Sequence, residues 1–299
     1  MKQDIQIILA PSILGLKPSG VEFLPESLIN AGLVDVLKPV RPVVDVPTQN
    51  VHYTFVRDRK THCLNPAQIQ KFSLILIDQI SRQVQSKTFP IVLGGDCSIL
   101  LGIMPALKRE GEFGLIFLDA HADFYQPSKS ITGEVADMDL AMVTGYGPNI
   151  LTNIDGLKPY VRTRNVIHIG QRDAEEARRY GSRDIKDTLI KCFDLEIIRT
   201  NGINGVMTKV LTLINRANIN GYWIHFDTDV LSDDENPAVD YRLPGGLSFK
   251  EVEYILHALL KTNRIAGMSV TIFNPTLDTS GTVAKKITNC LSNALASAP

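Results

Sequence analysis

The sequence predicts an α/β protein in which a mainly parallel β-sheet is covered by helices on both faces. Short apolar runs without polar alternation recur along the chain, and such runs suit strands that are buried on both faces. Each run is followed or preceded by a segment whose apolar residues have roughly 3.6-residue spacing, as in an amphipathic helix. Strands and helices that alternate over the whole length join through right-handed crossovers into a parallel sheet.

The expected strands are the six apolar runs 5–10, 90–93, 114–118, 165–170, 221–226 and 265–272. The expected helices are 22–31, 65–86, 98–109, 173–180, 206–218, 248–261 and 280–295. The Pro-rich stretch 38–47 is expected to be a surface loop. No repeat, low-complexity tract or linker divides the chain, so we expect residues 1–299 to form a single domain.

Composition and charge exclude several classes of function. The formal net charge of −1 gives no electrostatic reason to bind nucleic acid or an anionic membrane. No apolar stretch reaches the roughly 18 residues of a membrane span. The cysteines contain no Cys-x-x-Cys pair, and the first apolar run begins without the basic segment of a signal peptide. We therefore expect a cytoplasmic protein whose partner is a small molecule, with no nucleic acid and no membrane.

The densest chemistry lies in Asp119-Ala120-His121-Ala122-Asp123, directly after the strand expected at 114–118. Three potential metal ligands fall within five residues, in the kind of loop where open α/β sheets bind ligands. Carboxylates with one imidazole suit a hard or borderline divalent ion such as Mn²⁺. We predict that Asp119, His121 and Asp123 bind metal.

A second cluster, Asp227-Thr228-Asp229, follows the strand expected at 221–226. Because side chains alternate along a strand, His225, Asp227 and Asp229 share one face. Carboxylates shared between the two clusters can bridge two ions. We therefore expect Asp227 and Asp229 to be further metal ligands and His225 to be a catalytic residue.

The third candidate is Gly94-Gly95-Asp96-Cys97-Ser98, between an expected strand and an expected helix. Its glycines could simply supply the positive φ angles of a tight turn, with Ser98 as the helix N-cap. Cys97 alone is more often a small buried thiol than a metal ligand. Its position at the carboxyl end of a strand, as in both aspartate clusters, makes it the sixth candidate ligand.

Taken in chain order, with residues 94–98 first, 119–123 second and 227–229 third, the three motifs resemble those of the arginase, agmatinase and formimidoylglutamase family, the binuclear manganese ureohydrolases. The resemblance covers residues 94–274 and includes Pro237 and Pro244-Gly245-Gly246-Leu247. It implies a three-layer αβα fold with a mainly parallel eight-stranded sheet. It also implies homo-oligomers, usually trimers or hexamers, and hydrolysis of a guanidinium or amidine C–N bond by a metal-bridging hydroxide.

The resemblance also implies a ligand set for two divalent ions, with Mn²⁺ expected and Zn²⁺, Fe²⁺, Ni²⁺ or Co²⁺ as alternatives. By position, one ion would be held by Cys97, Asp119, Asp123 and Asp227, and the other by His121, Asp119, Asp227 and Asp229. Asp123 would also hold the hydroxide and pass its proton on, which makes it catalytic.

Four residues depart from the family pattern. Cys97 stands where the family has a metal-binding histidine, and a thiolate ligand adds negative charge and softness. Ala136 replaces the histidine that shuttles protons in arginases, and Ile272 replaces the glutamate that pairs with the substrate guanidinium. Glu175 replaces an aspartate that contacts the substrate α-amino group. A cysteine at the first position and a histidine like His225 also occur in the related N-hydroxyarginine hydrolase of D-cycloserine biosynthesis.

These departures argue against arginine as the substrate. We expect a cationic or polar linear C–N compound that contacts Glu134, Asp137, Glu175 and Asp240. Glu134 is also expected to be catalytic, because by motif position it is the carboxylate nearest to the missing glutamate. Two alternatives stay open. One is hydrolysis of a neutral amide, which suits the apolar Ile272, and the other is a metal-binding scaffold without turnover, since both guanidinium-specific groups are missing.

Overall fold

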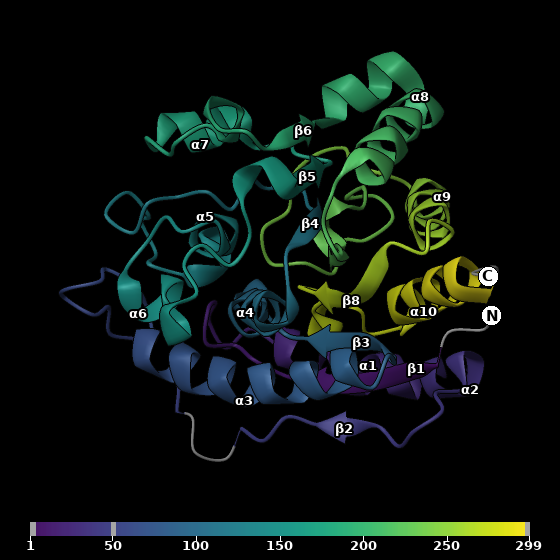
Figure 1. The fold of residues 1–299 in the computed structure, drawn as a ribbon, viewed down its shortest axis with the longest axis horizontal. Helices are drawn as coiled ribbons and strands as arrows, with labels where there is room; N and C mark the ends of the chain where they lie inside the picture. Colours follow the sequence, from purple (N-terminus) through teal and green to yellow (C-terminus); the bar gives the residue numbers. More distant parts are fainter. Residues whose placement is uncertain (1–3, 49–51, 297–299) are drawn as a thin grey trace.

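The computed structural model describes residues 4–48 and 52–296 and is built on one β-sheet. The eight strands follow the order β2-β1-β3-β8-β7-β4-β5-β6, so that β2 and β6 form the edges (Figure 1). All strand pairings in this sheet are parallel. The prediction of a parallel α/β sheet is confirmed. The strands are β1 (Ile5–Ala10), β2 (Val44–Asp45), β3 (Phe89–Gly94), β4 (Phe113–Leu118), β5 (Val166–Ile169), β6 (Lys191–Phe193), β7 (Gly221–Asp227) and β8 (Ile265–Thr271).

Helices pack on both faces of the sheet and produce three layers. The side chains of successive residues in a strand point to opposite faces of the sheet, so a hydrophobic core forms on each face. Ile7 and Ile91 lie in one core, and Ile8 and Val92 lie in the other. The first core is covered by α1 (Leu24–Asn30), α2 (Leu33–Leu37), α8 (Leu195–Arg216), α9 (Phe249–Leu260) and α10 (Thr282–Ala296). The second is covered by α3 (Pro66–Gln85), α4 (Leu100–Glu110), α5 (Asp139–Val143) and α6 (Asn149–Thr152). Within the described residues, no helix combines the length and the apolar character needed to cross a bilayer.

The six predicted strands are all present, and each boundary lies within one residue of the prediction. The edge strands β2 and β6 and the helices α2, α5 and α6 were not predicted, because segments of two to five residues are too short to display a period. Residues 44–45, expected to be surface loop, form β2 instead. The prediction also missed the first part of α8, where Gly202 has a φ of 70° and interrupts the helical geometry.

Side-chain caps determine where two of the long helices begin. Ser248 Oγ accepts a hydrogen bond from Glu251 N (3.2 Å), and Glu251 Oε2 accepts one from Ser248 N (2.8 Å), which forms a capping box at the start of α9. Asp194 Oδ1 accepts from Ile197 N (2.8 Å) and caps α8. The residue types at these positions thus mark the helix starts in the sequence.

Asp96 connects the loop after β3 to the loop after β1. Its backbone N donates to Ser12 O (2.9 Å), and its Oδ2 accepts from Ser12 Oγ (3.0 Å) and from Gly15 N (3.2 Å). Its Oδ1 accepts from Ser98 N (2.8 Å). Asp96, and not Ser98 as expected, therefore caps the short 3₁₀ turn Cys97–Ile99 that leads into α4. These bonds hold Cys97 in place at the end of β3.

Gly95 is required by close packing of the backbone. A Cβ atom at this position would lie only 1.9 Å from Ser12 O. Neither Gly94 nor Gly95 has a positive φ, so the expectation that these glycines supply positive φ angles is wrong. Glycine is needed at position 95 because the backbone of another loop approaches it closely. The sequence of the loop alone does not predict this contact.

We expect Gly95→Ala to destabilise the protein by about 2–3 kcal/mol, because the Ser12 carbonyl must move to admit a methyl group. Urea unfolding of the metal-free protein measures this difference in unfolding free energy. Gly205→Ala in α8 is the matched control, since a Cβ there meets only Asn201 Cβ at 3.8 Å. The control should stabilise the helix by up to about 1 kcal/mol. Equal stabilities of the two variants would contradict the close-approach argument.

Candidate metal centre

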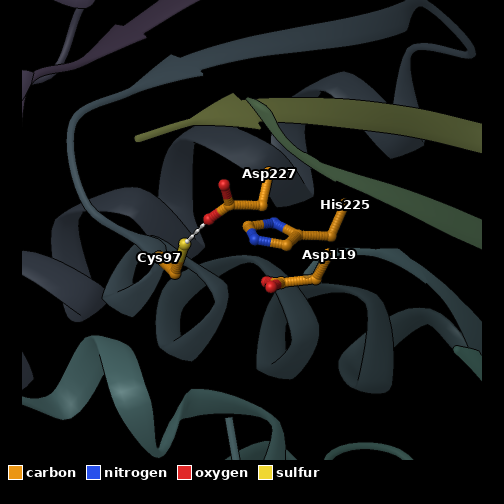
Figure 2. Close-up of side chains that lie close together, drawn as sticks. All are labelled: Cys97, Asp119, His225 and Asp227. Carbon is orange, nitrogen blue, oxygen red and sulfur yellow. Dashed lines mark hydrogen bonds between the residues drawn. The ribbon is translucent and has the colours of Figure 1, made fainter. Parts of the chain in front are cut away.

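The loops after β3, β4 and β7 bring the predicted metal ligands together at the carboxyl edge of the sheet. Cys97 follows β3, Asp119 follows β4, and Asp227 ends β7. One ligand atom from each of these residues and one from His225 lie within 4.8 Å of one another, and all four residues are buried (Figure 2). Segments up to 130 residues apart in the sequence thus form one site, as Cys97 Sγ and Asp227 Oδ2 are 2.8 Å apart.

The other predicted ligands border on this group. Ligand atoms of Asp119, His121 and Asp123 also lie within 4.8 Å of one another. Asp123 has a φ of 46°, in the left-handed region that aspartate tolerates better than most residues. Asp229 Oδ2 is 2.9 Å from His121 Nδ1. The two aspartate clusters are therefore in direct contact.

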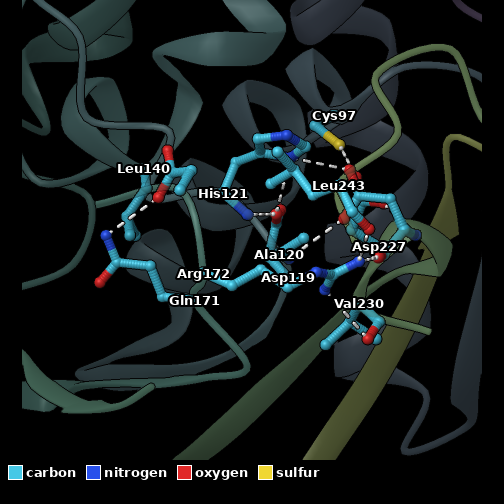
Figure 3. Close-up of polar contacts among 12 residues, drawn as sticks. Cys97, Asp119, Ala120, His121, Leu140, Gln171, Arg172, Asp227, Val230 and Leu243 are labelled. Carbon is cyan, nitrogen blue, oxygen red and sulfur yellow. Dashed lines mark hydrogen bonds and ion pairs between the residues drawn. The ribbon is translucent and has the colours of Figure 1, made fainter. Parts of the chain in front are cut away.

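Backbone amides orient three of these side chains (Figure 3). His121 N donates to Asp119 Oδ1 (2.6 Å), Ala120 N donates to Asp229 Oδ1 (3.1 Å), and Asp229 N donates to Asp227 Oδ1 (2.8 Å). An aspartate side chain readily accepts from the amide two residues further along the chain. The Asp-x-His and Asp-x-Asp spacings therefore organise the carboxylates before any ion binds.

Arg172, in the loop after β5, supports the loop after β7. Its guanidinium donates to the carbonyl oxygens of Asp229 (2.8 Å), Leu231 (3.1 Å), Val230 (3.3 Å) and Leu243 (3.3 Å). These backbone contacts hold the segment that carries Asp229 against the sheet. They also place a positive charge beside a site that is rich in carboxylates.

The site concentrates buried groups that can carry negative charge. Asp119, Asp123, Asp227 and Asp229 are each 6% exposed or less. Burial and the neighbouring carboxylates raise the pKa of Asp119 to about 7, and they raise the pKa values of Asp123 and Asp227 well above their usual range. Burial and the adjacent Asp227 likewise raise the pKa of the Cys97 thiol. Charged forms of these groups require a compensating cation.

The donor atoms fit a divalent metal ion. Among the described residues, Asp119 Oδ2 is buried without a hydrogen-bond partner. A buried carboxylate oxygen costs free energy unless a donor or a cation pairs with it. Carboxylates, an imidazole and a thiol together suit borderline ions such as Mn²⁺, Fe²⁺ and Zn²⁺.

His225 places a ring nitrogen in the ligand group but does not line the cavity described below. Its ring stacks on Phe117 with centroids 5.0 Å apart and an interplanar angle of 20°. Its Nδ1 is 2.9 Å from Ser269 Oγ, and its Nε2 is 3.3 Å from Thr271 Oγ1. Burial lowers the pKa of His225 to about 3, so the ring is neutral at neutral pH and carries one N–H.

A chain of hydrogen bonds favours one tautomer of His225, the one with the ring proton on Nε2. Trp223 Nε1 can only donate, and it donates to Ser269 Oγ (3.1 Å). The Ser269 hydroxyl hydrogen is then available to Nδ1, which leaves the ring proton on Nε2, where it donates to Thr271 Oγ1. Thr271 Oγ1 is 3.2 Å from Cys97 Sγ. When the sulfur loses its proton to bind a metal, the Thr271 hydroxyl becomes its hydrogen-bond donor.

A cavity of about 490 Å³ reaches the ligand group and contains three of the expected substrate contacts. Glu134 lines it, and its Oε2 accepts from Tyr241 OH (2.7 Å). Asp137 also lines it, with Oδ2 accepting from Ser130 Oγ (3.0 Å). Burial raises the pKa of Glu134 and raises that of Asp137 to about 7. Both carboxyl groups therefore lie at the cavity wall, where a bound molecule could contact them.

Asp240 lines the same cavity but is held by the protein. Its Oδ2 accepts from Ser19 Oγ (2.5 Å), and its Oδ1 accepts from Asn274 Nδ2 (3.0 Å). Asp240 therefore ties together three loops around the cavity as well as contributing negative charge to its wall.

Glu175 does not reach the cavity, which corrects the expectation that it contacts substrate. Its side chain is 88% exposed and pairs with Arg179 (3.7 Å). The cavity is lined instead by Asp173 and Glu176, which flank the start of α7 (Ala174–Arg179). Residues three apart share one face of a helix, and Glu175 lies off that face.

Ile272 and Ala136 form an apolar part of the cavity wall together with Leu16 and Cys97. Ile272 has a φ of 70°, which is a true outlier for a β-branched residue. Its N donates to Gly95 O (2.8 Å). Such strain costs on the order of 1–3 kcal/mol and persists where the surrounding structure imposes it. Ile272 thus combines a strained backbone with an apolar side chain at the cavity wall.

Asp139 also belongs to the site, although it was not predicted from the sequence. This residue begins α5, is fully buried, and places a ligand atom within 4.8 Å of ligand atoms of Cys97 and Asp123. A signal was present, because Asp137-Met138-Asp139 repeats the Asp-x-Asp pattern of the second cluster within an otherwise apolar segment.

Comparisons with known proteins agree on one family. Residues 3–297 match the arginase family. The arginase of Staphylococcus aureus (strain COL) is 31% identical over 289 residues, which cover 94% of this chain and 93% of that protein. The crystal structure of the arginase of Bacillus cereus is 26% identical with a TM-score of 0.86 and covers 98% of both chains. The formimidoylglutamase of Bacillus subtilis subsp. subtilis str. 168 shares the fold, with a TM-score of 0.75 at 19% identity over 98% of this chain and 86% of that one.

We expect Thr271→Val to weaken metal binding about 10-fold or more, because this change of similar shape removes the hydroxyl that donates to the Cys97 sulfur. Thr271→Ser keeps the hydroxyl and should restore the wild-type affinity. Competition with a chelator, followed by metal analysis, measures both values. If the valine variant binds metal as tightly as the wild type does, the chain of hydrogen bonds does not act on the sulfur.

Proposed function

The chain belongs to the arginase family, and from this premise we propose that it is a binuclear metal-dependent hydrolase of a linear C–N bond in a guanidino- or amidino-type small molecule other than arginine. Proteins of the family are hydrolases that act on non-peptide C–N bonds of such compounds. The observation that carries the proposal is the convergence of a thiol, imidazole and carboxylates at a cavity of about 490 Å³.

The proposed ligands divide between two ions. Cys97, Asp119, Asp123 and Asp227 would hold one, and His121, Asp119, Asp227 and Asp229 the other, with Mn²⁺ as the first choice. When bound, two divalent ions lower the pKa of a water molecule so that hydroxide is available at neutral pH. Support comes from the buried Asp119 Oδ2, which has no hydrogen-bond partner among the described residues.

Asp123 is the proposed proton carrier. It lines the cavity beside the ligand group and is only 6% exposed, so bulk water does not compete for its carboxylate. A carboxylate oxygen at this position can accept a proton from the attacking water and deliver it to the leaving nitrogen. Ala136, at the position of the arginase proton shuttle, cannot take part, so Asp123 would perform both transfers.

The charges around the cavity favour a cationic substrate that lacks a carboxylate. The only Lys or Arg among its described lining residues is Arg242, and its guanidinium is paired with Asp233 (2.9 Å). An anionic group on the substrate would be repelled and a guanidinium or amine attracted. The acidic residues at its wall outside the ligand group are Glu134, Asp137, Asp173, Glu176 and Asp240.

Glu134 is the proposed partner of the substrate cation. Tyr241 holds its carboxylate at the cavity wall, while Ile272 provides no anion at the position of the family glutamate. An unpaired buried guanidinium would cost several kcal/mol. The alternative is a substrate whose reactive group is neutral, and the apolar wall formed by Ile272 and Ala136 favours it.

We also propose that residues 1–299 form one domain that assembles into homo-trimers or hexamers in the cytoplasm. The assembly follows from the family resemblance. The location is supported by Cys63, Cys97, Cys192 and Cys290, which are all free thiols, as is usual in a reducing compartment.

Protein loaded with Mn²⁺ should hydrolyse a guanidino amine such as agmatine and should lose this activity when a chelator removes the metal. Re-addition of Mn²⁺ should restore the activity, which a colorimetric urea assay follows. A panel of L-arginine, amidines, N-hydroxyguanidines and primary amides tests the substrate class. Hydrolysis of L-arginine at about 10 per second or more would contradict the proposed specificity. If protein with both ions bound hydrolyses no compound of the panel, the alternative of a metal-binding scaffold without turnover is supported instead.

We expect Glu134→Gln to lower kcat/KM for the guanidino amine about 100-fold or more while metal content stays unchanged, because the substrate cation loses its buried partner. Tyr241→Phe removes only the hydrogen bond to Glu134 and should cost about 10-fold. Turnover of a neutral amide that is unaffected by Glu134→Gln would instead support the neutral-substrate alternative.

A further inference from the structure

Asp139 is a buried carboxylate for which the protein supplies no balancing charge in the part that the structure describes. It is 0% exposed and forms no ion pair with a basic side chain there. Its Oδ1 accepts from Leu140 N (2.7 Å). Its Oδ2 is buried and has no hydrogen-bond donor among the described residues, and the adjacent carboxyl group of Asp123 could share a hydrogen bond with Asp139 only if one of the two were protonated. An oxygen in this state needs a cation or a donor beside it.

The carboxylate of Asp139 is close enough to two proposed ligands to share an ion with them. One of its oxygens, Cys97 Sγ and an oxygen of Asp123 lie within 4.8 Å of one another. Metal–donor bonds of about 2.0–2.3 Å place two donors of one ion about 3–4.6 Å apart. The three groups therefore have the spacing of a common coordination sphere.

The fold holds Asp139 in this place. Ala141 N, in the first turn of α5, donates to Asp123 O (3.1 Å), so the start of the helix is tied to the turn that carries Asp123. Asp139 does not line the cavity, whereas Cys97 and Asp123 do. It is thus hidden from substrate but adjacent to the ligand group.

We propose that Asp139 is an additional metal ligand, which joins Cys97 and Asp123 around the ion on the β3 side of the centre. The inference rests on the proposed binuclear centre and adds a donor that the family resemblance does not provide. A thiolate and an extra carboxylate would give this ion a more anionic and softer donor set than histidine and aspartate alone. The added carboxylate charge strengthens the binding of the ion, and the soft thiolate shifts the preference toward Fe²⁺, Co²⁺ or Zn²⁺ relative to Mn²⁺.

The test compares Co²⁺ and Mn²⁺ binding by the wild type and Asp139→Asn. The asparagine keeps the shape of the side chain but removes its charge, so the affinity of one of the two ions should fall at least about 10-fold. In Co²⁺-loaded protein, the thiolate-to-cobalt charge-transfer band should shift and the visible d–d bands should change intensity, because the ion loses a donor. Chelator competition and absorption spectra record both effects without any substrate.

Asp137→Asn is the matched control. Asp137 is also a carboxylate with one buried, unpartnered oxygen, but it lies outside the group formed by Cys97, Asp123 and Asp139. This variant should keep the wild-type affinity and spectrum. Asp139→Ser, with the melting temperature measured with and without Co²⁺, replaces Asp139→Asn if that variant folds poorly. The rise in melting temperature caused by the metal should be smaller than in the wild type.

The outcomes separate this inference from the proposed function. If the wild type binds two ions and Asp139→Asn matches it in affinity and spectrum, Asp139 is not a ligand. It would then be a neutral carboxylic acid that shares a hydrogen bond with Asp123, a role in which asparagine can replace it. The proposed binuclear centre would then stand. A wild-type protein that binds no ion would overturn both.

Discussion

The main constraint at the carboxyl edge of the sheet is that several aspartate carboxyl groups are buried next to one another. Burial and the neighbouring carboxylates raise the pKa values of Asp119, Asp123 and Asp227 and so disfavour their charged forms. The adjacent His121 lowers the pKa of Asp229 despite its burial. These carboxyl groups are held together by backbone amides, by the guanidinium of Arg172 behind the loop, and by the packing of the strands beneath them. Without cations, this arrangement lowers the stability of the folded protein. Bound cations would offset the repulsion between the carboxylates and stabilise the fold.

The cysteine at the end of β3 lies between a hydroxyl group and an apolar part of the cavity wall. Thr271 on β8 lies with its hydroxyl 3.2 Å from the sulfur and is connected through the ring of His225 to Ser269 in a buried row. Ile272 and Ala136 remove the polar groups from the adjacent wall. These residues form one environment, which joins the thiol of Cys97 to an apolar part of the cavity wall.

Much of the fold and the position of the centre could be predicted because both depend on local patterns. Buried strands are apolar runs, and strand ends at one edge of a parallel sheet must meet, so Asp119 and Asp227 could be paired across 108 positions of sequence. The prediction failed where tertiary packing decides. The position of Glu175 on α7 directs its side chain to solvent. Position 95 must be glycine because a carbonyl oxygen from another loop lies close to it. Asp139 lies near Cys97 and Asp123 only because α5 packs against the turn at Asp123.

The strand order has a consequence for how the protein is made. β8, the last strand along the chain, lies in the sheet between β3 and β7 and pairs with both. Until residues 265–271 leave the ribosome, the strands that carry Cys97 and those that carry the aspartates have no common neighbour to join them. The centre therefore forms late in synthesis, and its long-range pairings make assembly slow relative to that of the helices. A nascent chain that stops short of β8 would expose two half-sheets with open inner edges, which are surfaces suited to chaperones or to aggregation.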